Sequence, residues 1–178
     1  MEHVPWDRRS RRAGSTRRSV IAAVAALTLV AVAAAGMAAT LAPGPNGCPT
    51  NKSLKTAPIA DLAPPARTQI EAFDVLSGPI NAGTQTFTMK VRVGSTCGVD
   101  IKGASVYVTA VPYDQFTIPD EELTGDDGNA TLVFRRDANF PASSKQQQLT
   151  LFIRATKPGE NPLAGVSTRR LVAIPFGS

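Results

Sequence analysis

Short runs in which apolar and polar residues alternate are the feature that most limits what this chain can fold into. In residues 86–93 every second position is apolar: Phe87, Met89, Val91 and Val93. Because successive side chains of a strand point to opposite faces, this pattern predicts a strand with one buried face. Residues 104–111, 129–136 and 148–155 repeat the pattern, and residues 70–76 and 169–176 show it less regularly.

Turn-forming sequences rich in Gly, Pro, Asn and Asp separate these runs. They lie at residues 77–79, 81–83, 102–103, 126–128 and 157–159. No helical period is visible after Ala42. Six or seven short strands in about 110 residues predict an all-β fold, a single antiparallel β-sandwich over residues 68–178. A sandwich this small leaves little internal space, so we expect binding to use loops or sheet faces.

Three segments resemble exported bacterial immunoglobulin-like modules of the invasin and carboxypeptidase-regulatory-like types. Lys102–Ala110 resembles their G-A-x-V-x-V strand, and Thr124–Phe134 resembles the turn and strand that follow it. Leu151–Val172 is similar to the C-terminal part of such envelope proteins. The resemblance implies an immunoglobulin-like sandwich of about seven strands, and it carries no catalytic residue or cofactor site.

A charge-free run, Ser19–Ala42, precedes the predicted sandwich. As a helix it would rise about 36 Å, which exceeds the roughly 30 Å of a bilayer core. Arg17 and Arg18 stand just before it, so the positive-inside rule predicts a cytoplasmic leader at residues 1–18 and an external C-terminal domain.

The hydrophobic helix is either kept or removed. Its length favours an uncleaved single-pass anchor in the cell membrane, whereas the small residues Ala33–Ala35 fit signal cleavage near Ala35 and secretion. The paired Arg17 and Arg18 match a twin-arginine signal only in part. Cys48 lacks the small residues that a lipid-attachment site needs before it.

The positive charge belongs to the leader. Six of the nineteen basic residues and two of the fourteen acidic ones lie in residues 1–18, so this segment carries +4 of the net charge of +5. Nucleic-acid binding by a folded domain needs a basic face on that domain. We therefore predict no nucleic-acid partner.

Residues 43–67 contain six prolines, which predicts an extended spacer. Cys48 and Cys97 are the only cysteines, and in an exported chain an even pair predicts a disulfide. It would pin the spacer near Thr96–Gly98. Closing a loop of about 50 residues would stabilise the fold by about 4 kcal/mol in the chain-entropy model.

Catalytic and metal chemistry has little support in the sequence. The one histidine, His3, belongs to the leader. Gly165–Arg169 begins like a nucleophile elbow but ends in Arg, so we read it as a turn into the last strand. Asp126–Asn129 lacks the spaced ligands of an EF-hand, so we read it as a hairpin turn, with Asp120–Glu122 as a solvated loop. We predict no enzyme activity, metal or cofactor.

Tyr113 and Phe116 are the candidate contact residues, because aromatic residues on a proline-bounded connection are common interface anchors. The alternative is a crossing strand that packs both rings on the core. We expect a non-enzymatic interaction or structural module outside the cytoplasm, bound to an unidentified envelope protein or polysaccharide. The competing hypothesis is an accessory domain that binds the substrate or the enzyme of an envelope enzyme system.

Overall fold

The computed structural model describes residues 42–51 and 53–177. The predicted leader and almost all of the predicted hydrophobic helix lie outside the described residues. Within the described ranges, no helix has the length and apolar character needed to cross a membrane.

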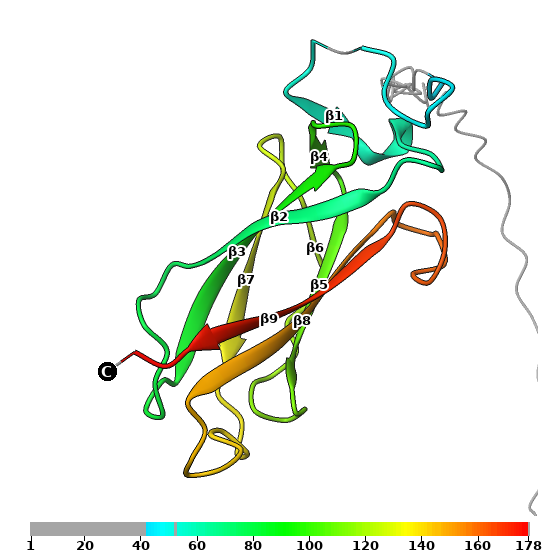
Figure 1. The fold of residues 1–178 in the computed structure, drawn as a ribbon. Coiled ribbons are helices and arrows are strands. Elements are labelled where there is room, and N and C mark those ends of the chain that lie inside the picture. Colours follow the sequence, from blue (N-terminus) through cyan, green and yellow to red (C-terminus); the bar gives the residue numbers. More distant parts are fainter. Residues whose placement is uncertain (1–41, 52, 178) are drawn as a thin grey trace, which may run out of the picture. The chain divides into compact units, whose positions relative to one another are not determined.

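The fold is all-β, with two layers of strands (Figure 1). The strands are β1 (Thr56–Pro58), β2 (Thr68–Val75), β3 (Thr86–Ser95), β4 (Asp100–Lys102), β5 (Ser105–Val111), β6 (Glu122–Leu123), β7 (Asn129–Arg135), β8 (Gln148–Thr156) and β9 (Thr168–Pro175). The six longer strands coincide with the six predicted runs. The three short strands, β1, β4 and β6, bring the described total to nine.

The first sheet is built around β3, which pairs antiparallel with β2 on one side and with β7 on the other. Past Asn129, the first residue of β7, β4 takes the place of β7 beside β3, where Gly94 pairs with Asp100. β1 then adds to β4 in parallel. The second sheet has the order β6-β5-β8-β9, and all its pairs are antiparallel.

The core lies between the two sheets. The alternating positions predicted to be buried are buried in β3, β5, β7 and β8, and Phe87, Val108, Phe134 and Ile153 are at most 1% exposed. One continuous apolar cluster includes residues of both sheets. The structure thus confirms the predicted face of each of these strands, and the arrangement is that of a β-sandwich.

The predicted spacer, residues 43–67, is folded onto the sandwich over its second half. β1 is followed by a 3-10 helix at Ile59–Asp61. Four apolar side chains that stand between the prolines enter the core: Ala57, Ile59, Leu62 and Ala66. The folded domain therefore begins well before residue 68. The prolines of this segment lack the N–H that strand pairing needs, but burial of the four apolar side chains stabilises the segment on the sandwich.

The Asp126–Asn129 segment is a tight turn, as predicted, but the strands that it joins, β6 and β7, belong to different sheets and do not form a hairpin. Gly128 has φ +71°, and its N–H donates to Gly125 O at 3.0 Å. A Cβ at this position would meet Asp100 Cβ at 2.8 Å, so both the backbone conformation and the space require glycine. This turn connects β6 to β7 and holds Asp126 and Asp127 on the surface.

Candidate functional site

A disulfide joins Cys48 to Cys97, with the two Cα atoms 5.8 Å apart. The predicted bridge is confirmed, as is its place at the turn after β3. The same turn holds the chain just before β2, since Thr96 N donates to Arg67 O at 2.9 Å and Arg67 N donates to Thr96 Oγ1 at 3.1 Å. The segment before β1 is thereby fixed to the β3–β4 turn.

The two predicted contact residues have different environments. Tyr113 is 65% exposed, on the connection between β5 and β6. Phe116 is 2% exposed, with its ring centroid 4.9 Å from that of Phe87 and 4.4 Å from that of Phe140. Phe116 is therefore a core residue, as in the alternative interpretation, and only Tyr113 is available to a partner.

A fully buried glutamine holds the connection that carries Tyr113. Gln115 Nε2 donates to Pro112 O at 2.9 Å, and Gln115 Oε1 accepts from Gln146 Nε2 at 2.7 Å. Gln115 O also accepts from Asp137 N at 2.9 Å. Asp114 has φ +66°, a left-handed conformation that is uncommon outside glycine. Tyr113 thus projects from a loop whose backbone is fixed on both sides.

Other connections surround this loop at one end of the sandwich. The β2–β3, β5–β6 and β7–β8 connections lie at this end, and β1 and β4 lie at the other (Figure 1). Arg136 links two of these connections, because its backbone N donates to Gln85 O at 2.6 Å and its Nη1 donates to Ala82 O at 3.1 Å. We call this loop-bearing end the free end, since the disulfide lies at the opposite one.

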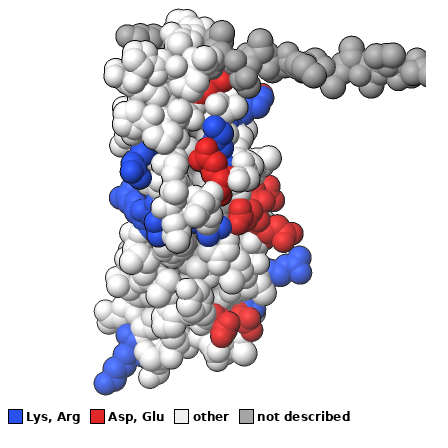
Figure 2. Space-filling view, turned by 90° about the vertical axis from the view of Figure 1, so that its right-hand side faces the viewer, with Lys and Arg blue, Asp and Glu red and all other residues white. Residues whose placement is uncertain are grey.

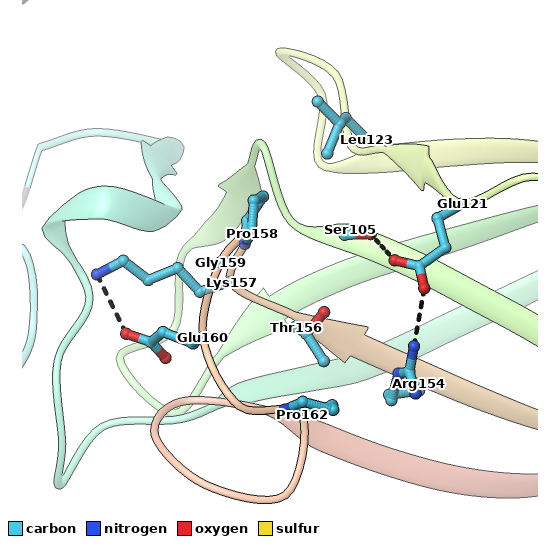
Figure 3. A pocket seen from close by; sticks show the side chains of 10 residues that line it. All are labelled: Ser105, Glu121, Leu123, Arg154, Thr156, Lys157, Pro158, Gly159, Glu160 and Pro162. Atoms are coloured by element: carbon cyan, nitrogen blue, oxygen red, sulfur yellow. Dashed lines mark hydrogen bonds and ion pairs between the residues drawn. The ribbon is translucent and has the colours of Figure 1, made fainter.

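A polar depression lies on the second sheet (Figure 3). Its volume is about 420 Å³. Its walls come from the start of β5, the end of β8, the segment around β6 and the connection after β8. The lining residues are Ser105, Glu121, Leu123, Arg154, Thr156, Lys157, Pro158, Gly159, Glu160 and Pro162.

Two ion pairs occupy the ends of this depression (Figure 3). At one end Glu121 accepts from Arg154 Nη2 at 2.8 Å and from the Ser105 hydroxyl. At the other end Lys157 Nζ lies 3.6 Å from Glu160 Oε1. The Arg154 guanidinium also lies 4.7 Å from the Tyr107 ring centroid, so it is held by a carboxylate and an aromatic face.

Two buried polar atoms of these ion pairs have no hydrogen-bond partner in the described chain: Arg154 Nε and Glu160 Oε2. Most buried polar groups of native proteins have a partner, so each exception calls for a reason. One atom is a donor and the other an acceptor. Asp61 Oδ1 is the remaining buried atom of this kind among the described residues.

The outer face of the first sheet carries a separate charged group. Arg92 donates to Asp100 Oδ1 and Oδ2, both at 2.8 Å, and this paired carboxylate raises the pKa of Arg92. The pKa of Asp127 is lowered, chiefly because the Asn129 side-chain amide donates to its carboxylate at 2.8 Å. Among the described residues no cluster of His, Cys, Asp or Glu has the arrangement of a metal site.

No protein-family model matches the chain, and no curated protein and no solved structure matches it significantly. The resemblance of Lys102–Ala110 and Thr124–Phe134 to exported immunoglobulin-like modules therefore stays a prediction.

The depression in Figure 3 is not evident from the sequence. The sequence alone places Glu121 in a solvated acidic loop, and Arg154 on the outer face of a strand. Alternation identifies a strand's faces but does not say which strands are neighbours. Only the pairing of β5 with β8 places Ser105 opposite Thr156 and Tyr107 opposite Arg154.

Proposed function

We propose that the chain is a non-enzymatic, immunoglobulin-like interaction module displayed outside the cytoplasm, and that the free end with Tyr113 contacts a protein or polysaccharide of the cell envelope. The loop that displays Tyr113 carries this proposal. Its buried Gln115 and Phe116 fix the backbone, and the ring of Tyr113 stays 65% exposed. A rigid exposed aromatic residue loses little conformational entropy on binding, which favours its use as an anchor.

The strand order supports the immunoglobulin-like assignment. In such sandwiches the first, second and fifth strands share one sheet, and the third, sixth and seventh share the other. Here β2, β3 and β7 share one sheet, while β5, β8 and β9 share the other. The fourth strand in this count, β6, departs from the constant-type pattern, because it lies beside β5 and not in the first sheet. The disulfide differs from the usual bridge between the sheets, because Cys48 precedes the first long strand.

Two observations support display outside the cytoplasm. Structural disulfides persist in oxidising compartments, and Cys48–Cys97 is such a bond. The charge-free run Ser19–Ala42 after an Arg-rich leader has the pattern of a membrane anchor or an export signal.

Affinity capture from solubilised envelope, with the full-length chain as bait, tests the proposal. We expect the Tyr113→Ala variant to recover its partner at least about tenfold less well than the parent chain. Leu163→Ala is the matched control, because Leu163 is 69% exposed but lies on the β8–β9 connection. Equal recovery by the two variants, or recovery of no partner by the parent chain, would count against the proposal.

A further inference from the structure

Strand pairing and side-chain hydrogen bonds hold the walls of the depression in Figure 3. Its floor is the paired β5 and β8. The connection after β8 is fixed at two places. Lys157 Nζ donates to Ala60 O and Leu62 O, both at 3.4 Å. Ser167 Oγ lies 2.9 Å from Pro162 O and from Ala164 O. A site whose walls are already fixed loses less free energy on binding than one that must first become ordered.

The charges of the lining cancel. Glu121 and Glu160 carry two negative charges, and Arg154 and Lys157 carry two positive ones. In the view of Figure 2, most Lys and Arg side chains lie toward one margin and most Asp and Glu side chains toward the other. A polyanion would meet two carboxylates here and a polycation two cations, so the lining favours a polar ligand without net charge.

The unpartnered atoms specify the groups of that ligand. Arg154 Nε needs an acceptor and Glu160 Oε2 needs a donor. A hydroxyl group is both a donor and an acceptor, so a ligand with several hydroxyls satisfies both atoms. The two side chains are 24% and 34% exposed, so both ion pairs are accessible from solvent. Hydrogen bonds to charged groups are also stronger than those between neutral groups.

We propose that this depression binds a neutral, hydroxyl-rich glycan of the cell envelope. The ion pairs at the two ends provide donors and acceptors for the hydroxyls. Leu123, Pro158 and Pro162 provide apolar edges for the C–H faces of a sugar ring. The volume of about 420 Å³ lies within the range of about 300–1,000 Å³ that is usual for small-molecule sites. The glycan site is separate from Tyr113, and it needs from the proposed function only display outside the cytoplasm.

Titration of the isotope-labelled full-length chain in detergent micelles with neutral hexasaccharides tests this site. The probes are cellohexaose, maltohexaose and mannohexaose, each raised to about 10 mM, where a ligand with a millimolar Kd occupies most of the site. We expect at least one probe to shift amide resonances of residues 154–160 and of Ser105 and Glu121. Shifts confined to other parts of the chain, or no shifts with any probe, would overturn the proposal.

Paired variants distinguish the site from the surface around it. We expect the double variant Glu121→Ala/Glu160→Ala to bind the tightest-binding hexasaccharide at least about tenfold more weakly than the parent chain. The control combines Asp120→Ala with Glu122→Ala, which remove the same charge from a neighbouring depression that lies outside this site. We expect the affinity of the control variant for the same hexasaccharide to stay within about twofold of that of the parent chain. Equal losses in both pairs would also overturn the proposal, and thermal unfolding shows whether each variant is folded.

The envelope capture experiment separates the two proposals. Capture that depends on Tyr113, with no hexasaccharide binding, rejects the glycan site and leaves the proposed function in place. Hexasaccharide binding at residues 154–160, with capture that is insensitive to Tyr113→Ala, supports the glycan site and rejects the role of the free end.

Discussion

Phe87 and Phe134 lie directly opposite each other on β3 and β7, with ring centroids 4.5 Å apart and ring planes 4° apart. Phe116 meets Phe87 edge-on, and Phe140 packs on Phe116. Phe176, just after β9, extends this row of rings with a centroid 5.6 Å from that of Phe140. The aromatic row therefore connects the first sheet to the loops of the free end.

Truncation of this row should destabilise the whole domain. Phe134 is fully buried, so we expect Phe134→Ala to lower the free energy of unfolding by about 3–5 kcal/mol, through lost burial and the cavity that remains. Val133, the preceding residue, is 53% exposed, and Val133→Ala should change the free energy of unfolding by less than about 0.5 kcal/mol. Denaturant unfolding of both variants measures the difference, and similar values would contradict the assigned strand faces.

Phe116 and Tyr113 should respond in opposite ways. Phe116→Ala should cost about 3–5 kcal/mol of unfolding free energy, because it removes a buried ring from the aromatic row. Tyr113→Ala should leave stability within about 0.5 kcal/mol and reduce partner capture, because its ring is exposed. Denaturant unfolding and envelope capture of both variants check this. A large stability loss for Tyr113→Ala would show that its ring packs on the domain.

Removal of the disulfide should weaken the domain as a whole. In Cys48→Ser/Cys97→Ser the free energy of unfolding should fall by about 2–5 kcal/mol, because the unfolded chain gains conformational entropy when the loop is opened. Reduction of the parent chain should have the same effect, whereas reductant should not change the double variant. If reduction leaves the unfolding curve of the parent chain unchanged, the segment before β1 is held by its other contacts.

The long strands were predictable because the alternation of buried and exposed residues is visible within each strand's own sequence. Each inward residue of β3 and β8 stands two positions from the next, so the sequence identifies the strand and its buried face without knowledge of the partner strand. β1 has only three residues and ends in Pro58, which is too short for alternation to be seen. The burial of Ile59 and Leu62 depends on the fold around them, and the prolines nearby favoured a spacer.

The candidate sites depend on contacts that a strand pattern does not contain. Gln115 is polar, yet it is fully buried, because Pro112 O and Gln146 satisfy its amide. The depression combines Ser105, Glu121 and Arg154, which come from separate parts of the chain. These residues lie close together because of the strand register. Hydrophobic alternation shows which face of a strand each residue is on, but not which residue of the neighbouring strand lies opposite it.

Stability at low pH should depend in part on Asp127. Its folded-state pKa is below the unfolded value of about 3.9, so its contribution is complete above that pH and is lost as the pH falls through the folded pKa. Asn129→Ala removes the largest cause of this shift and should raise the Asp127 pKa toward the ordinary value. Carboxyl carbon NMR titration measures it, and an unchanged pKa would contradict the role of the Asn129 amide.

Alanine substitutions at two glycines distinguish the effect of backbone strain from that of steric crowding. Gly78 has φ +90°, and no atom lies within 4 Å of the position that an alanine methyl group would take, so Gly78→Ala tests the backbone conformation alone. We expect it to cost about 1–2 kcal/mol. Gly128→Ala adds a contact of 2.8 Å with Asp100 Cβ and one of 3.1 Å with Val93 O. It should therefore cost at least about 1 kcal/mol more than Gly78→Ala in denaturant unfolding. If both variants lose the same free energy of unfolding, β4 can move away from the added methyl group without destabilising the domain. The ion pair between Arg92 on β3 and Asp100 on β4 would then not depend on the close approach of the β6–β7 turn.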